Sequence, residues 1–437
     1  MNGLSSAHAP SLDLPARFMA LSVISLAIIA GSAVWTLPLM QGPFADYSLL
    51  ALVHLCTLGF VGAMIIGASY QLVPVALQVP LSSPRVGRIS FWFYGSGLAL
   101  FLIGLGATRV ALIGIGGTSL AIAFLLYIGV IAVTWIRTPE RDVVAWHLAI
   151  GLLGAGVGMV LGFSLALNKS NGMLGSRLLG VLAAHITLML GGWVAITFTG
   201  VAYRLIGMFT LSEAHFVRWL AWVELALCAG GSWLLAAQFV FGLPALVGQI
   251  AAVAILAGLI CFAVQIMHLY RRRMRRALDV YMPFAIVAAL SGIGSAGVLA
   301  AGLFRHEGPN SSMWVAAVWL ALMGTAGTAI QGFFYKIATF LVWLKRYAPV
   351  AGRERVPRLE ELYNRRLAMA GWSLWTAAVL AGAIALVGNW RVLPWVGTIL
   401  FAALASFLFN VMLIARHWLS GFSPDKNRLL PRHGTAH

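Results

Sequence analysis

Twelve stretches of this 437-residue chain are apolar over the length that a helix needs to cross a lipid bilayer. Backbone groups inside a bilayer must find hydrogen bonds within their own segment, so such stretches fold as helices. With 61% hydrophobic and 9% charged residues, the chain does not have the composition of a soluble domain. The sequence therefore predicts an all-α, polytopic membrane protein with twelve transmembrane helices. They lie at about 18–40, 47–69, 90–108, 111–136, 144–167, 178–200, 216–238, 244–268, 281–304, 313–335, 367–388 and 393–415.

The two ends of the chain flank this bundle. Residues 1–17 lack a basic segment followed by a short apolar core and a cleavage site, so we interpret them as a retained tail and not as a signal peptide. Residues 18–416 are expected to form one transmembrane bundle, and residues 417–437 a second tail.

Basic residues are unevenly divided between the two sides of the predicted bundle. The net charge is +17, and if the N-terminus is cytoplasmic, all but five of the 29 Lys and Arg residues lie on the cytoplasmic side, including RRRMRR at 271–276. The positive-inside rule then predicts cytoplasmic termini in a membrane of the bacterial inner type. The basic excess would contact anionic lipid headgroups, and nucleic acid is not expected as a partner. The five residues on the other side are Arg109, Lys169, Arg177, Arg305 and Arg391.

A short motif recurs three times, ending in Tyr70, Tyr203 and Tyr335, which are 133 and 132 residues apart. Glycines precede each tyrosine at the same two offsets, and a polar residue follows it. This common spacing predicts three parallel four-helix repeats at about 18–140, 141–276 and 277–416. The matching positions are Gly59, Gly192 and Gly324, then Gly67, Gly200 and Gly332, and finally Gln71, Arg204 and Lys336.

The three motif tyrosines are predicted to lie at the cytoplasmic membrane boundary. Amphipathic rings and long cationic side chains are favoured there. The simplest interpretation of Tyr70, Tyr203 and Tyr335 is therefore that of interfacial anchors, and a role in a proton path is the alternative. The glycines before them would let neighbouring helices approach closely, as packing in lipid requires.

Two of the ten histidines lie at intramembrane depth. His54 and His185 are each about seven residues inside their helices, or about 10 Å below the outer boundary at about 1.5 Å per residue. A ring at that depth needs a hydrogen-bond partner, a cavity or a metal, and imidazole is a good ligand of haem iron and of copper. The others are expected to be solvated or interfacial: His8, His215, His433 and His437 in tails or a loop, His306 in an external loop, and His147, His268 and His417 at cytoplasmic helix ends.

The segments HLCTLGFVGAMIIGASYQLVP, AHITLMLGGWVAITFTGVAYRLIGMF and QGFFYKIATFLVWLKRY resemble subunit I of the haem-copper oxidase superfamily, particularly the cbb-type cytochrome oxidases and nitric oxide reductases. The resemblance implies a threefold pseudosymmetric bundle with haem or copper in its outer half, other respiratory-type subunits as partners, and a role in respiration or nitric oxide handling. Ligands of that family lie on the second and sixth helices, where His54 and His185 stand. His54 is accordingly expected to bind haem iron. His185 lies at a different offset from its tyrosine, so its ring is expected to line a separate small polar site.

The chain also departs from that family. Its tenth and seventh predicted helices, 313–335 and 216–238, contain no histidine, so the usual two-haem and copper set cannot form and oxygen reduction is not expected. A second axial ligand would have to be another group, such as the soft donors Met64 and Met189. Packing in the core is the simpler role for both methionines.

Glu224 is the only carboxylate well inside a predicted helix. Two interpretations of Glu224 are open: it is a hydrogen-bonded packing residue, or it is part of a proton or ion path. A repeat-built transporter or channel, with Glu224 and His185 along a polar path, is therefore the alternative to the haem or copper protein. A structural subunit without chemistry is the third interpretation.

Overall fold

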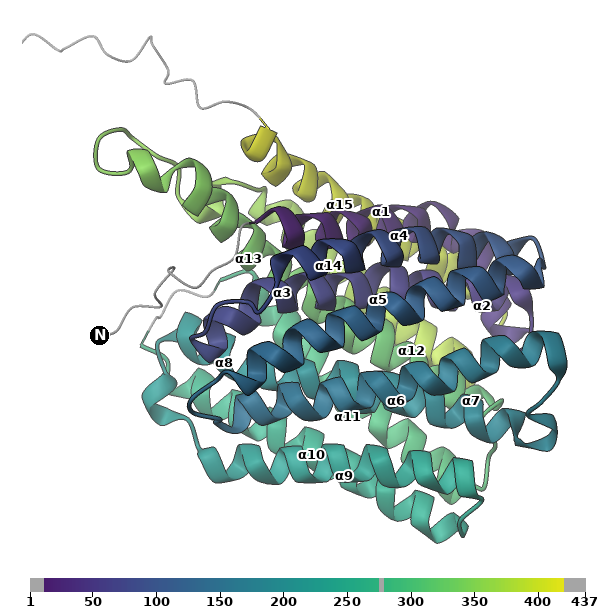
Figure 1. The fold of residues 1–437 in the computed structure, drawn as a ribbon. Coiled ribbons are helices and arrows are strands. Elements are labelled where there is room, and N and C mark those ends of the chain that lie inside the picture. The colour runs from purple at the N-terminus through teal and green to yellow at the C-terminus, as the bar shows by residue number, and fades with distance from the viewer. Residues whose placement is uncertain (1–11, 275–278, 420–437) are drawn as a thin grey trace, which may run out of the picture.

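The structure is a computed structural model that describes residues 12–274 and 279–419. Within these residues the fold is all-α, and twelve helical spans are long and apolar enough to cross a membrane, which confirms the predicted class (Figure 1). The predictions for the tails fall largely outside the described residues, as do the last two arginines of RRRMRR. The first helix begins at Asp13, five residues before the predicted start, and the last ends at Leu419.

Eight of the twelve described spans are single α-helices, and a ninth joins α1 (Asp13–Thr36) to a short 3-10 helix, Leu37–Gln41. Side-chain caps mark several starts: Ser83, Asp142 and Asn364 each accept a hydrogen bond from the backbone N–H three residues later. The nine helices are α1 (Asp13–Thr36), α4 (Pro84–Gly106), α5 (Val110–Ile136), α6 (Val143–Asn171), α9 (Arg218–Phe241), α10 (Ala245–Arg271), α11 (Tyr281–Phe304), α14 (Arg365–Val387) and α15 (Leu393–Leu419).

The three remaining spans are the motif-bearing helices, and each has a π-helical segment at its centre. The segments are eight residues long and each ends eight residues before the motif tyrosine. Such π-helical turns are rare and are frequent at functional sites. The composite helices are α2 (Tyr47–His54), η3 (Leu55–Gly62) and α3 (Ala63–Leu77); α7 (Leu178–Thr187), η5 (Leu188–Ala195) and α8 (Ile196–Thr210); and α12 (Ser312–Trp319), η7 (Leu320–Gly327) and α13 (Thr328–Arg346).

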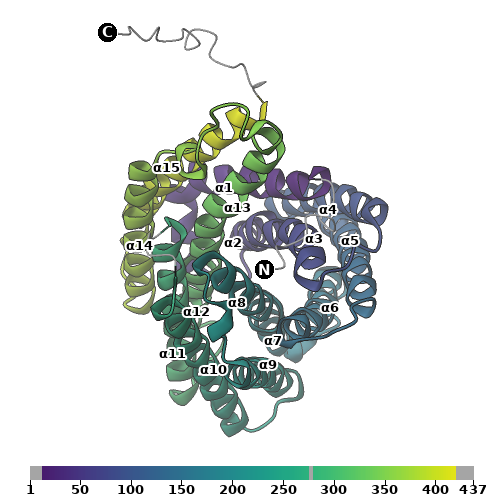
Figure 2. The ribbon, with the colours of Figure 1, turned by 90° about the vertical axis from the view of Figure 1, so that its left-hand side faces the viewer.

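The helices form a closed ring around the composite helices (Figure 2). α4 packs on α5, α9 on α10 and α14 on α15, while α1, α6 and α11 each pack on the composite helix that follows them in the chain. The ring closes through α5 with α6, α10 with α11, and α15 with α1. The composite helix Ser312–Arg346 is the most deeply buried of the twelve spans.

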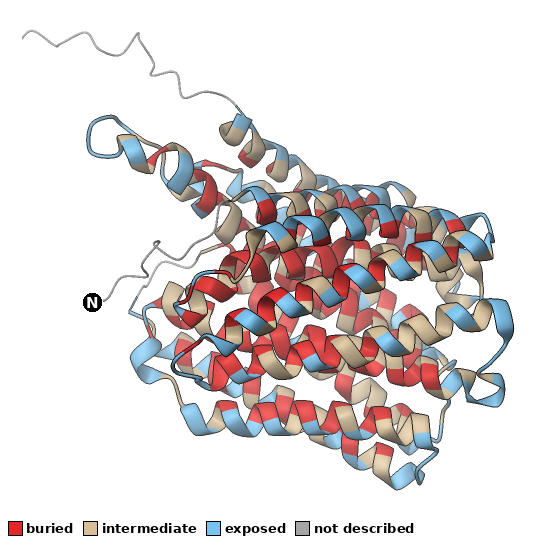
Figure 3. Cartoon of the chain, viewed as in Figure 1, coloured by how far each residue is buried: buried red, intermediate tan, exposed pale blue. Residues whose placement is uncertain are grey.

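The surface of the bundle is apolar on its sides. Large hydrophobic residues such as Trp92, Ile115 and Phe401 are exposed there, and buried residues line the inward faces of the helices (Figure 3). Because water does not favour so much exposed apolar surface, lipid is the solvent that fits these faces. The described ends of α1 and α15 lie at the same end of the bundle (Figure 1).

The α6 helix runs antiparallel to the composite helix α7–η5–α8 along a row of glycines. A Cβ at Gly154 would lie 2.4 Å from the Gly192 carbonyl oxygen, so here the two backbones touch. The row continues in both directions at a spacing of three or four residues, which keeps it on one helix face. Its contacts pair Gly200 with His147, Gly151 with Thr197, Gly158 with Met189, and Gly162 with His185.

Replacing Gly154 by alanine should destabilise the bundle by about 1–3 kcal/mol, because the added methyl group meets a backbone oxygen that cannot rotate away. Gly95→Ala is the matched control. A Cβ at Gly95 meets nothing within 4 Å, so the better helix propensity of alanine should leave stability unchanged or slightly higher. Thermal unfolding of the two variants in detergent measures the difference, and equal midpoints would contradict the close approach.

The expected interfacial anchors are the main correction to the sequence interpretation. Tyr70, Tyr203 and Tyr335 are at most 3% exposed and lie inside the bundle. Each hydroxyl is satisfied there by a side chain of another helix, respectively Ser90, Glu224 and Asn410. The composite helices are longer than the predicted spans and continue past the tyrosines, which therefore lie within the protein and not at its lipid boundary.

Candidate functional site

His54 and His185 are held in the same way. Each lies near the end of the α-helical turn that precedes a π-helical segment, on α2 and α7 respectively. The Nδ1 atom of His54 lies 2.7 Å from the carbonyl oxygen of Leu50, and that of His185 lies 2.7 Å from the carbonyl oxygen of Gly158. A carbonyl oxygen only accepts, so Nδ1 carries the proton in both rings, and Nε2 is left with its lone pair.

Close packing fixes the orientation of both rings. The His54 ring meets Phe101 edge to face, with centroids 5.1 Å apart. The His185 ring lies against Gly162, where a Cβ would come within 2.6 Å of it. Gly117 of α5 lies between the two places, because a Cβ there would be 3.9 Å from the Phe101 ring and 3.7 Å from Ala166, which is one helical turn after Gly162. The structure therefore brings the two predicted residues into one neighbourhood.

The hydrogen bonds of His54 and His185 are those expected of an imidazole that serves as an axial ligand. A histidine that ligates a metal usually donates its other ring N–H to a carbonyl or carboxylate, which orients the ring, and both histidines have this arrangement. In residues 12–274 and 279–419 no group of three or more His, Cys, Asp or Glu side chains is placed to hold a metal ion. A haem needs only one or two axial ligands from the protein.

The two predicted methionine donors lie in different surroundings. The Met189 sulfur would be 2.7 Å from a Cβ at Gly158, so it lies against the same stretch of α6 as the His185 ring. Met64 is buried and lines a separate cavity that is described below. Of the two, Met189 is thus the one near a candidate ligand.

Glu224 belongs to a second buried cluster, which the sequence interpretation only half identified. Its Oε2 atom lies 2.7 Å from His147 Nε2 and accepts a hydrogen bond of 3.2 Å from the Tyr203 hydroxyl. The His147 and Glu224 side chains are both fully buried. The three residues come from α6, α8 and α9, so the packing of three helices assembles this cluster.

His147 contradicts the expectation of a solvated or interfacial ring. It is the fifth residue of α6, which suggested a position at the membrane surface, yet it is 0% exposed. The signal that could have identified it is the glycine row: His147 precedes Gly151, Gly154, Gly158 and Gly162 at helical spacing. A histidine that shares the packed face of its helix has to be buried.

Several polar groups on α9 and α10 lack partners among the described residues. Glu224 Oε1 accepts no hydrogen bond, and neither polar atom of the Gln265 side chain has a partner. Cys228 and Cys261 lie within electrostatic reach of the carboxylate. Buried groups of this kind are ordinarily satisfied by water or by a ligand.

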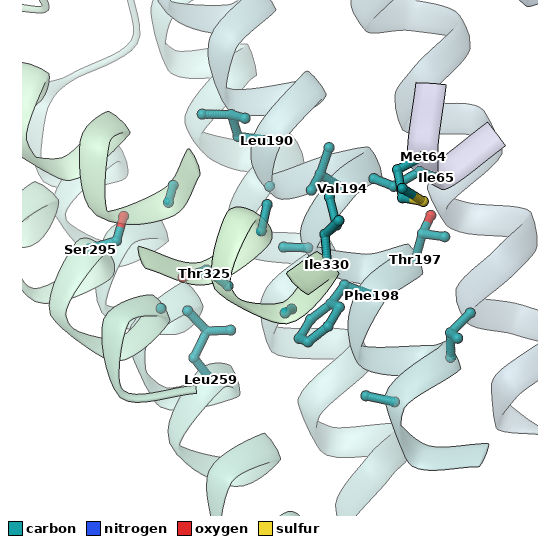
Figure 4. A pocket seen from close by; sticks show the side chains of 18 of the residues that line it. Met64, Ile65, Leu190, Val194, Thr197, Phe198, Leu259, Ser295, Thr325 and Ile330 are labelled. Carbon is teal, nitrogen blue, oxygen red and sulfur yellow. The ribbon is translucent and has the colours of Figure 1, made fainter. Parts of the chain in front are cut away.

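A largely apolar cavity of about 230 Å³ lies between the composite helices and their neighbours (Figure 4). Met64 and Ile65 line it from α3, Phe198 from α8 and Ile330 from α13. Its few polar groups include the hydroxyl of Thr197 (Figure 4). A cavity of this character accepts an apolar guest in preference to an ion.

Four further histidines lie in the described part of the chain, and none of them has a comparable arrangement. The structure leaves His215 and His306 exposed and His268 half-buried, while His417 is half-buried and bonds the Tyr347 hydroxyl through Nδ1 at 2.7 Å. His8, His433 and His437 lie outside the described residues. The functional candidates are therefore the His54 and His185 neighbourhood and the cluster of His147, Tyr203 and Glu224.

The sequence matches no known family profile and no curated protein.

Proposed function

We propose that this polytopic membrane protein binds haem in a bundle of three four-helix repeats that is related in architecture to subunit I of haem-copper oxidases. His54 and His185 are the proposed ligands. The chain would serve in redox or nitric oxide handling in the inner membrane and not as a complete oxygen-reducing oxidase.

The repeat arrangement is supported by features that recur at fixed offsets. The three π-helical segments have the same length and the same distance from their tyrosines. The glycine three residues before each tyrosine also packs against the Cβ of one residue on the preceding helix: Phe18, His147 or Phe284. Each of these rings lies against the tyrosine itself, with centroids 5.7, 5.7 and 6.0 Å apart.

The ligand proposal depends on one observation. The Nδ1 atoms of His54 and His185 are both bonded to backbone carbonyls, so both Nε2 lone pairs are available in the same packed region of α4, α5 and α6. The sequence interpretation assigned the two rings to separate sites, and their proximity leads us to propose a shared one. The haem would supply one-electron chemistry or bind a diatomic ligand. Copper is the alternative occupant of the same two nitrogens.

The visible spectrum of protein purified from haem-replete cells tests the proposal. A Soret band is expected, and protein without one would end the haem proposal.

A transporter or channel is the second candidate function, and Glu224 is the observation that favours it. A fully buried carboxylate inside a repeat-built bundle is costly and often marks the path of a proton or ion. In that case the purified chain would carry no chromophore, and solute or ion flux into proteoliposomes would depend on Glu224.

The cytoplasmic location of both termini is a further part of the proposal, because the basic residues crowd that end of the bundle. A cysteine in place of the exposed Arg272 should react with a membrane-impermeant maleimide only after cells are permeabilised. A cysteine in place of the exposed Asn310, in the loop between α11 and α12 at the other end, should react in intact cells. The reverse labelling pattern would show that the orientation is inverted.

A further inference from the structure

The second four-helix unit contains a buried group that the other two units do not use. In the second unit, His147 packs against Gly200 and Tyr203. At the equivalent place in the first unit, Phe18 packs against Gly67 and Tyr70. Phe284 takes the same place in the third unit. The helix crossing therefore accepts an apolar ring, so packing alone does not require a histidine.

The partner of the tyrosine hydroxyl differs in the same way. Tyr70 bonds the neutral Ser90 and Tyr335 bonds the neutral Asn410, whereas Tyr203 bonds the carboxyl group of Glu224. A buried acid and base that face each other are weak evidence for stability, because desolvation costs about as much as their attraction supplies. The pair in the second unit thus needs an explanation other than folding.

The hydrogen bonds define where protons can reside. His147 Nδ1 donates to the carbonyl oxygen of Val143 at 2.7 Å, so that nitrogen keeps its proton. The 2.7 Å contact between His147 Nε2 and Glu224 Oε2 requires one proton between these two atoms. Whether the pair is imidazole with carboxylic acid or imidazolium with carboxylate, it holds the same number of protons.

Release of that shared proton would leave two acceptors facing each other. The Tyr203 hydroxyl can still donate to the carboxylate, but His147 Nε2 then needs a new donor, which water can supply. The unpartnered Glu224 Oε1 and Gln265 side chain are the polar groups that such water would bond. Gln265 lies on the face of α10 that packs against α9, because Gly258, two helical turns before it, meets the Cys228 thiol and the Glu224 carbonyl oxygen.

The cluster is close to one end of the bundle. His147 is the fifth residue of α6 and Glu224 the seventh of α9, so they lie about 6–10 Å from the starts of these helices. Both helices start at the end that carries the two described chain ends (Figure 1).

We propose that His147, Glu224 and Tyr203 form a proton-binding site inside the membrane, which takes up and releases one proton through water bonded to Glu224. The other titratable groups that face the carboxylate are Cys228 from α9 itself and Cys261 from α10. The site is independent of haem: it can serve a redox protein or a transporter by loading or unloading a proton from one side.

Infrared difference spectroscopy of the full chain in detergent tests the proposal. Spectra recorded from about pH 4 to about pH 9 should contain a carboxyl or carboxylate band that titrates and that shifts when H₂O is replaced by D₂O. Glu224→Gln should remove this band completely. The double variant His147→Phe with Glu224→Leu copies the apolar ring of the other units, so it should fold and should also lack the band.

Two results would overturn the proposal. One is a Glu224 band that neither titrates nor shifts in D₂O, which would mean a static hydrogen bond sealed from water. The other is a pH-difference spectrum that is the same for the wild-type chain, Glu224→Gln and the double variant. Neither result depends on whether the preparation contains haem, so failure here is distinguishable from failure of the haem proposal.

Discussion

Replacing His54 by alanine should remove the Soret absorption of the purified chain. Loss of groups that merely orient a metal ligand costs about 10-fold to 100-fold in affinity, and loss of the ligand itself should cost at least as much. The haem content per chain, measured by pyridine haemochrome against protein concentration, should therefore fall by at least about 10-fold. The physical reason is that the substitution removes the Nε2 lone pair of His54, which the Leu50 carbonyl orients.

His306→Ala is the matched control for this loss. His306 is exposed in the loop between α11 and α12, so its replacement should leave both the haem content and the band position unchanged. A spectrum that is indifferent to His54→Ala would contradict the assignment, even if the protein contains haem.

The variant His185→Ala distinguishes one ligand site shared by His54 and His185 from two separate sites. If both rings ligate one iron, the alanine variant should keep haem with a shifted band and a changed spin state. If His185 lines its own polar site, as the sequence predicts, the band should stay where it is. Added imidazole should restore the wild-type spectrum of His185→Ala only in the first case.

The sequence alone predicts the twelve membrane spans, because the apolar length that a span requires is a local property of the chain. About twenty apolar residues must form a helix in lipid, whatever their neighbours are. The glycine and tyrosine offsets were also visible, and the structure places a π-helical segment at the same offset in all three motif helices. No residue pattern in the motif predicts a π-helical segment, because the wider turn of a π-helix depends on the packing of neighbouring helices.

The buried cluster was missed for a different reason. Distance along the predicted helices places His147 and the three tyrosines near the surface. The composite helices continue past the three tyrosines, and His147 lies on the face of α6 that packs against α8, so depth along the helix and burial in the protein diverge. Glu224 was recognised only because a carboxylate inside an apolar stretch is conspicuous in itself.

Breaking the His147 and Glu224 pair on one side should destabilise the chain strongly. Glu224→Leu leaves His147 Nε2 and the Tyr203 hydroxyl without a partner inside the bundle, and His147→Phe leaves the carboxyl group with only the tyrosine. Removal of one member of a buried pair costs about 3–5 kcal/mol, because the remaining polar group stays buried and unsatisfied. Each single variant should therefore unfold at a clearly lower denaturant concentration.

The double variant should be more stable than either single one. With phenylalanine at 147 and leucine at 224, the crossing of α6 with α8 has an apolar ring, as Phe18 and Phe284 provide at their own helix crossings, and only the Tyr203 hydroxyl loses its partner. Replacing a whole buried pair by apolar residues is often neutral or stabilising. Equilibrium unfolding in mixed detergent and SDS, with tryptophan fluorescence as the signal, measures the four members of the cycle. A double variant whose loss equals the sum of the two single losses would mean that the side chains do not interact, and the 2.7 Å contact would then have no energetic consequence.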